Sequence, residues 1–256
     1  MIKNDLKRSV LRGLVAVVTI VLISWAMSGA EVEIGRLLNG LPRMAEFFGR
    51  MVPPDLGVAS SVVSSTLETI QIALFGTVVA AVVSFVLGLL AANNLTPRWI
   101  NQPIKSFLGV LRGIPLILLA VMFVSTVGLG PFPGVLAIAV HSTGMLGKFY
   151  AEAFENADKG VFEAIDSSGA SWFQRVRFAV LPQVAPDVAR DTMFRFELNL
   201  RESLVLGLVG AGGIGFYIQS YVRAFQYERV ATLTLMVIVM VIAVEQLSTW
   251  IRRQLR

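Results

Sequence analysis

The sequence predicts an all-helical bundle that crosses a membrane several times. Of its 256 residues, 55% are hydrophobic and only 15% are charged, whereas a soluble domain carries about 25% charged residues. The mean hydropathy is +0.71. Several apolar runs also approach the roughly 20 residues that a helix needs to span a bilayer. Together these three observations favour a polytopic membrane protein with about six transmembrane helices.

The apolar segments follow one another along the whole chain. The first covers residues 13–29 after a basic start, and because no convincing cleavage site follows it we expect an uncleaved helix. The third apolar segment, Ile104–Val127, is interrupted by Arg112 and Pro115. The remaining spans are predicted over Leu67–Ala92, Ile104–Val127, Pro133–Tyr150, Val188–Leu208 and Val230–Trp250.

Basic residues orient these spans, because cytoplasmic flanks carry an excess of Lys and Arg. With the N-terminus inside, the cytoplasmic side holds Lys3, Lys7, Arg8, Arg12, Arg98, Lys105, Arg112, Lys148, Lys159, Arg175, Arg177, Arg190, Arg252, Arg253 and Arg256. The outer side holds only Arg36, Arg43, Arg50, Arg223 and Arg229. Both termini are therefore predicted inside, and the net charge of +5 reflects topology and not nucleic-acid binding.

We expect one transmembrane domain over residues 1–256, with two long connections. The external segment, residues 30–65, contains an amphipathic stretch, Ile34–Phe48, that is typical of a helix lying on membrane lipid. The core covers residues 66–253 and includes a cytoplasmic loop over residues 151–183.

A glycine-rich stretch follows the fifth span. Gly210, Gly212 and Gly215 have the G-x-G-x-x-G spacing of a dinucleotide-binding turn, but that turn needs a βαβ unit and an acidic residue about 20 positions later. Here Glu228 is the nearest later acid, and membrane spans flank the stretch. With Gly213, these glycines are predicted to break a helix at its outer end, as a pore or gate; close helix packing through small residues is the alternative.

The cytoplasmic loop contains EAIDSSGASWFQRVRFAVLP, from Glu163 to Pro182. It resembles the loop of type I ABC importer permeases, in which Glu-Ala-Ala, Gly and Ile-x-Leu-Pro recur at fixed spacing. The matching or typical positions are Glu163, Ala164, Asp166, Gly169, Ala170, Leu181 and Pro182, whereas Ile165 and Ala179 depart from the pattern. The resemblance implies a helix that docks on an ATPase subunit through Glu163. We expect Gly169 to end this helix with a positive φ. The predicted apolar docking surface comprises Trp172, Phe173, Val176 and Phe178.

The fifth span carries four charges. At about 100° per residue, Arg195 and Glu202 share one side, and Glu197 and Arg201 share the opposite side. Such a helix must pack against protein or water. The arginines either attract an anionic substrate or form neutralising pairs, Arg195–Glu202 and Glu197–Arg201.

His141 is a weaker pathway candidate, since a lone histidine in a bundle is more often simply hydrogen-bonded. The chain contains this single His and no Cys, which argues against a metal site. It also lacks a G-x-x-x-x-G-K-[ST] phosphate loop, so we expect no ATP hydrolysis and no cofactor in this chain. ATP and Mg²⁺ are expected in a separate ATPase.

The string Arg195–Gly215, with Arg112-Gly113-Ile114-Pro115, is similar to the phosphonate and phosphite branch of these permeases. The resemblance implies a homodimer with two ATP-binding subunits and an external substrate-binding protein in the bacterial inner membrane. Its cargo would be a phosphonate, phosphite or similar oxyanion, carried by alternating access. The alternatives are a methionine-like or other small-solute importer, an ion-coupled secondary transporter, and a membrane scaffold without transport.

Overall fold

A computed structural model describes the backbone of residues 2–31 and 33–254, and the side chains of residues 11–31 and 33–254. The described residues form helices joined by turns, and no strand occurs among them. The chain divides into two compact units, Met1–Arg50 and Met51–Arg256. The basic side chains of Lys3, Lys7, Arg8 and Arg256, which contribute to the predicted orientation, lie outside the described part.

The first unit consists of two helices, α1 (Ile2–Gly29) and α2 (Ile34–Gly49). The apolar core of α1 agrees with the predicted first span, although the helix begins earlier. The helix predicted over Ile34–Phe48 is confirmed as α2, and its apolar side chains, such as Leu37 and Leu41, are exposed. An amphipathic helix with an open apolar face is the form expected at a membrane interface.

The second unit begins with a short 3₁₀ turn, Leu56–Val58, followed directly by α3 (Ala59–Ala91). The predicted external segment, residues 30–65, therefore overlaps the first turns of this helix. Ser and Thr residues in the first turns of α3 made the apolar run begin later in the sequence. Their hydroxyls are satisfied by carbonyl groups of the same helix. Ser65 Oγ donates to the Val62 carbonyl at 3.0 Å and Thr66 Oγ1 donates to the same oxygen at 2.6 Å.

The predicted third span is a broken pair of helices, α4 (Arg98–Gly113) and α5 (Leu116–Val127), bent by 83°. Pro115 explains the break, because proline lacks a backbone N–H and excludes the preceding residue from helical geometry. Ile114 accordingly takes an extended conformation, with ψ at 121°.

The rest of the unit contains longer helices than predicted and two short helices that the sequence did not predict. The elements are α6 (Pro131–Glu155), α7 (Lys159–Ser167), α8 (Trp172–Arg175), a π turn (Val176–Val180), α9 (Leu181–Gly207), α10 (Gly213–Arg223) and α11 (Tyr227–Gln254). α10 was not predicted. It occupies the connection between the fifth and sixth predicted spans.

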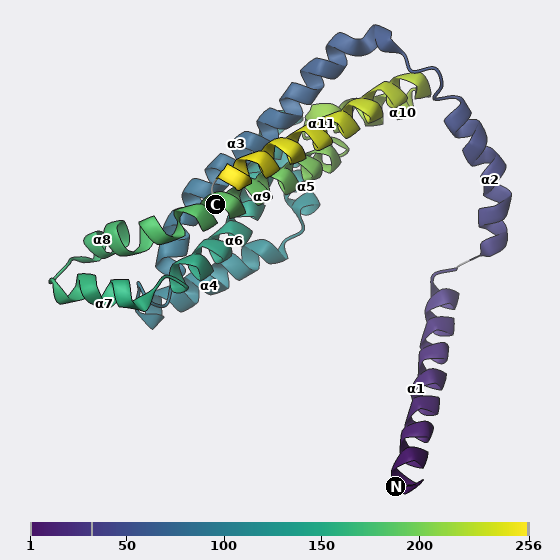
Figure 1. Ribbon diagram of the computed structural model, residues 1–256. Coiled ribbons are helices and arrows are strands. Elements are labelled where there is room, and N and C mark those ends of the chain that lie inside the picture. Colours follow the sequence, from purple (N-terminus) through teal and green to yellow (C-terminus); the bar gives the residue numbers. More distant parts are fainter. Residues whose placement is uncertain (1, 32, 255–256) are drawn as a thin grey trace. The chain divides into compact units, whose positions relative to one another are not determined.

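α6 is the central helix of the second unit. It packs along α3 and also contacts α4, α5 and α9. Tyr150 and Phe154 of α6 are at most 1% exposed and belong to the same core as Ala80 of α3. On the visible face, α11 runs beside α3 (Figure 1).

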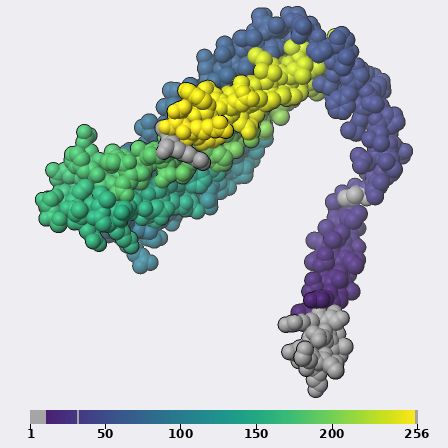
Figure 2. Space-filling view, viewed as in Figure 1, coloured from purple at the N-terminus to yellow at the C-terminus, as the bar shows by residue number. Residues whose placement is uncertain are grey.

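The helices α7 and α8 form a hairpin that projects from one end of this unit (Figure 1). Figure 2 shows their side chains in green at the molecular surface. We call residues 158–175 the α7–α8 hairpin. Most of its side chains are exposed.

Three helices are long and apolar enough to cross a membrane, and a fourth is added if the bent α4–α5 pair is one span. The three segments are Leu11–Gly29, Leu56–Ala91 and Tyr227–Gln254. Among the described residues, α6 and α9 do not satisfy the same criterion, because polar and charged side chains interrupt them. Those side chains are largely packed against protein, as the next section describes, so the six-span count stays a prediction.

Candidate functional site

The guanidinium of Arg195 lies at the centre of a buried polar cluster. Its side chain is 1% exposed, and its Nη2 atom lies 2.7 Å from Oε2 of Glu202. Its Nε donates to Ser142 Oγ at 2.9 Å, and Nη1 contacts the sulfur of Met145 at 3.4 Å. The predicted Arg195–Glu202 pair is therefore present, and α6 supplies further partners.

Asn199 extends this cluster to α3. Its Oδ1 accepts a hydrogen bond from Ser142 Oγ at 2.9 Å, and its Nδ2 donates to Thr77 Oγ1 at 2.8 Å. We call the set Thr77, Ser142, Arg195, Asn199 and Glu202 the polar network. It links three helices and satisfies donors whose burial without partners would cost several kcal/mol, about 2–7.

Sequence reasoning missed Ser142, Asn199 and Thr77 as members of the network. A signal existed for Asn199, because it lies four residues after Arg195 and three before Glu202, on the same helix face. No comparable signal marks Ser142 or Thr77, whose involvement depends on how α3 and α6 pack against α9.

The predicted pair between Glu197 and Arg201 is wrong. Glu197 Oε1 instead lies 2.7 Å from Nη1 of Arg252, and Arg201 Nη2 lies 3.2 Å from Oε2 of Glu245. Both new partners belong to α11, which packs beside this face of α9. The prediction considered one helix alone, so it could assign only partners within that helix.

The two α9–α11 pairs differ in burial. Glu197 and Arg252 are 11% and 25% exposed, whereas Arg201 and Glu245 are about half exposed, at 50% and 56%. Of Arg195 and Arg201, the two arginines considered for the anion pathway, only Arg201 is accessible.

His141 contacts the break between α4 and α5. Its Nδ1 lies 3.1 Å from the carbonyl oxygen of Ile114, an oxygen that a continuous helix would have bonded internally. This geometry agrees with a hydrogen-bonded histidine inside the bundle, which was the alternative to a pathway role.

The glycine-rich stretch does break the helix. α9 ends at Gly207, α10 begins at Gly213, and Gly210, Gly212 and Gly213 all have positive φ values, between 70° and 89°. A Cβ atom on Gly212 would lie 2.6 Å from Oε1 of Glu68, so a side chain meets both backbone strain and a steric overlap. Gly215 is equally crowded, because an added Cβ would overlap the Leu204 carbonyl oxygen.

Two α3 residues hold the start of α10. Glu68 Oε1 accepts the backbone N–H of Gly213 at 2.9 Å, and Thr69 Oγ1 accepts that of Ile214 at 2.8 Å. These bonds satisfy N–H groups that have no partner within a helix. Glu68 and Thr69 are distant in sequence from the glycines, so sequence reasoning missed them.

The α7–α8 hairpin is organised by its own residues. Asp158 accepts the Gly160 N–H at 2.8 Å at the start of α7, and Gly169 follows that helix with φ at +75°, as predicted. Arg175 Nε then donates to Asp166 Oδ1 at 2.8 Å, which ties α8 back to α7. Glu163 and Ala164 are exposed on α7, Ala170 and Leu181 are partly buried, and Pro182 is exposed.

The predicted apolar docking surface is only partly correct. Phe173 and Phe178 are 79% and 58% exposed. Val176 is buried, and Trp172 packs inward with its Nε1 donating to the Leu95 carbonyl at 3.0 Å. The sequence pattern did not reveal which of these four side chains face inward.

Known proteins resemble this chain in sequence and in fold. Residues 84–256 match the family described as binding-protein-dependent transport system inner membrane component. The phosphite transport system permease protein PtxC of Stutzerimonas stutzeri is 40% identical over 221 residues, which cover 86% of this chain and 80% of that protein. The putative phosphite transport system permease protein HtxC of the same organism is 35% identical over 98% of this chain and 89% of its own length.

A solved structure gives the same fold. The inward-facing MetNI methionine ABC transporter superposes with a TM-score of 0.69 at 19% identity, over 79% of this chain and 99% of the compared chain. The identity is too low to carry substrate information, but the helical arrangement agrees with the type I importer fold. On the family match and the identities to PtxC and HtxC, the chain belongs to the family of inner membrane components of binding-protein-dependent transport systems.

Proposed function

We propose that the chain is the permease subunit of an ABC importer for phosphite, a phosphonate or a similar small phosphorus oxyanion. The observation that carries this proposal is the 40% identity to PtxC, named a phosphite transport permease, over 86% of the chain. HtxC, with a related name, supports it over 98% of the chain. The MetNI likeness supports only the fold.

The family defines the coarse role of the chain. It is a non-catalytic, multi-pass membrane subunit, and ATP hydrolysis belongs to a separate ATPase that works with a substrate-binding protein. We further propose a homodimer bound to two ATPases in the bacterial inner membrane, with no cofactor in this chain. A heterodimer with a second permease is the competing arrangement, and native mass spectrometry of the purified complex separates the two by subunit mass.

Alternating access is the mechanism that we propose. The α7–α8 hairpin, with Glu163 exposed on it, would transmit closure of the ATPases to the bundle. The break from Gly207 to Gly213 would contribute to an outer gate. The burial of Arg195 favours a structural pair with Glu202 over direct substrate contact.

Uptake by the reconstituted complex tests the proposed cargo. Proteoliposomes containing permease, ATPase and binding protein are loaded with ATP and supplied in turn with phosphite, methylphosphonate, phosphate and methionine. We expect ATP-dependent uptake of a phosphorus oxyanion and none by the permease without its ATPase. Uptake of methionine without any oxyanion would assign the alternative cargo, and uptake driven by an ion gradient alone would assign a secondary transporter.

A further inference from the structure

A cavity of about 280 Å³ lies between α4 and α6 and is lined by three basic side chains. Lys105 and Arg112 come from α4, and Lys148 comes from α6. Glu152 and Glu155 of α6 are the acidic residues of the lining. The cavity is smaller than the roughly 300–1,000 Å³ of sites for drug-sized ligands, so it suits a small group.

The basic side chains are not equally neutralised. Lys105 Nζ lies 2.8 Å from Oε1 of Glu155, and the same oxygen accepts the backbone N–H of Asn93 at 2.8 Å. Both side chains of this pair are about one-third exposed or less, at 33% and 26%. The Lys105–Glu155 pair therefore forms a fixed wall of the cavity and contributes no free charge.

Lys148 is held much more loosely. Its Nζ lies 3.5 Å from Oε1 of Glu152, and the two side chains are 50% and 54% exposed. An exposed i, i+4 pair of this kind contributes little to stability. Lys148 can therefore exchange Glu152 for another anion at little cost.

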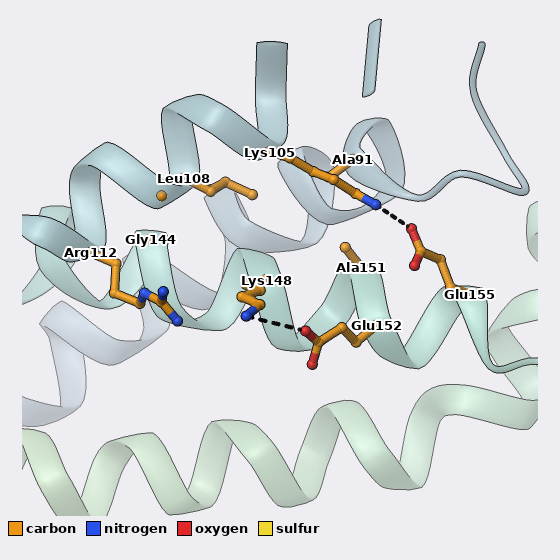
Figure 3. Close-up of a pocket in the computed structure, with 10 residues that line it drawn as sticks. Ala91, Lys105, Leu108, Arg112, Gly144, Lys148, Ala151, Glu152 and Glu155 are labelled. Carbon is orange, nitrogen blue, oxygen red and sulfur yellow. Dashed lines mark hydrogen bonds and ion pairs between the residues drawn. The ribbon is translucent and has the colours of Figure 1, made fainter. Parts of the chain in front are cut away.

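Arg112 has no acidic partner. Within the described part of the chain, no carboxylate lies at ion-pair distance from its guanidinium. In the view of Figure 3, Lys148 lies between Arg112 and Glu152. The cavity is thus lined by one unpaired and one exchangeable cation.

We propose that this cavity binds a phosphorus-oxyanion group between Arg112 and Lys148. A guanidinium offers a planar fork of donors, and an ammonium offers a point charge, a combination that suits the oxygens of a tetrahedral phosphorus oxyanion. The cavity is distinct from the polar network around Arg195 and from the glycine break. On binding, Lys148 leaves Glu152 for the ligand.

Two sources could supply this chemical group. One is the free oxyanion on the cytoplasmic side of the permease, a source that rests on the proposed function. The other is the phosphate of an anionic lipid, because the predicted topology places α4 and the end of α6 at the cytoplasmic leaflet. The binding chemistry is the same in both cases, so the experiment has one arm for each.

The first arm measures binding of inorganic phosphate. The permease–ATPase complex, without nucleotide or binding protein, is placed in neutral phosphatidylcholine nanodiscs and titrated with radiolabelled phosphate at equilibrium. We compare the native chain with the double variant Arg112→Gln/Lys148→Gln. Arg98→Gln is the matched control, because Arg98 is an exposed basic residue of the same helix and does not line the cavity. We expect at least about tenfold weaker binding in the double variant and no change in the control.

The second arm measures retention of an anionic lipid. The same three complexes are purified from membranes containing phosphatidylglycerol and phosphatidylcholine, and bound lipid is quantified by native mass spectrometry. Phosphatidylglycerol retained by the native chain and by Arg98→Gln, but lost from the double variant, would identify the lipid phosphate as the source. Phosphate binding with the same dependence would identify the free anion.

A variant that is expected to strengthen anion binding distinguishes loss of the site from a general loss of structure. Glu152→Gln removes the carboxylate that competes for Lys148, so it is expected to tighten binding of phosphate or phosphatidylglycerol severalfold. If the double variant fails to assemble, Arg112→Lys takes its place in both arms. This variant keeps the charge but loses the fork of donors, so we expect it to retain only part of the binding. The proposal is overturned if neither probe distinguishes the double variant from the native complex, or if Glu152→Gln weakens binding. Failure of oxyanion uptake with lipid retention intact would contradict only the proposed cargo.

Discussion

The α7–α8 hairpin and the polar network differ in where their partners come from. In the hairpin, Asp158 caps a residue two positions later, and Asp166 pairs with Arg175 nine positions later. In the polar network, Arg195 bonds Ser142 on α6, and Asn199 bonds Thr77 on α3. Short-range partners can be read from the sequence, whereas partners on other helices depend on packing.

This difference has energetic consequences. Most hairpin side chains are exposed, so substitutions there should alter the partner surface and leave the stability of the permease unchanged. The network is buried, so each substitution leaves a polar group without its partner. The following predictions test that contrast, in order of decreasing effect on permease stability.

The largest effect is expected from breaking the Arg195–Glu202 pair. Glu202→Ala leaves a guanidinium that is 1% exposed without its carboxylate, and loss of one partner from a buried pair costs roughly 3–5 kcal/mol. We expect a large loss of folded complex, measured by thermal unfolding in detergent. The double variant Arg195→Met/Glu202→Gln should be milder than Glu202→Ala, because it removes both charges. If the double variant assembles but never transports, while Glu202→Gln alone transports, Arg195 belongs to the anion pathway.

The glycine break should be nearly as sensitive. Gly212→Val introduces a branched side chain at φ of +79° and an overlap with Glu68, and backbone strain alone costs about 1–3 kcal/mol. Uptake by proteoliposomes should fall to background with some assembled complex retained. The control is Gly35→Ala on α2, because an added Cβ there meets no atom within 4 Å. Full uptake by Gly212→Val would show that this backbone is free to relax and is no gate.

The α9–α11 pairs should give intermediate and small effects. Arg252→Ala leaves Glu197, which is 11% exposed, without its partner, so we expect clear destabilisation that Glu197→Gln partly reverses. Arg201→Ala disrupts a half-exposed pair with Glu245 and should cost only about 0.2–1 kcal/mol. Thermal unfolding of Arg252→Ala, Arg252→Ala/Glu197→Gln and Arg201→Ala measures these effects. A measurable coupling between Arg201 and Glu197 in place of Arg252 would contradict the observed pairing.

The hairpin should show the smallest stability effect and a large functional one. Glu163→Lys changes an exposed residue, so the unfolding free energy should stay within about 0.5 kcal/mol of the native value. Co-purification of the ATPase, or stimulation of its ATP hydrolysis by loaded binding protein, should fall. Lys159→Gln, an exposed change on the same helix, is the matched control. Normal stimulation by Glu163→Lys would remove Glu163 from the docking surface.

The sequence alone was sufficient for the elements that depend on local composition. Long apolar runs predicted α3 and α11, the amphipathic pattern predicted α2, and Gly169 predicted the end of α7. The family resemblance rested on short motifs around Glu163 and Arg195, and the match over residues 84–256 agrees with it. Apolar burial and backbone restrictions act on neighbouring residues, so a linear sequence contains this information.

Only the tertiary structure decided which side chains meet. It assigned Glu197 to Arg252 in place of Arg201, and it placed Ser142 and Thr77 in the polar network. It also turned Trp172 inward and brought Arg112 and Lys148 to one cavity. A charged side chain pairs with whichever opposite charge lies nearest in space, and helices far apart in sequence supply that charge once they are packed.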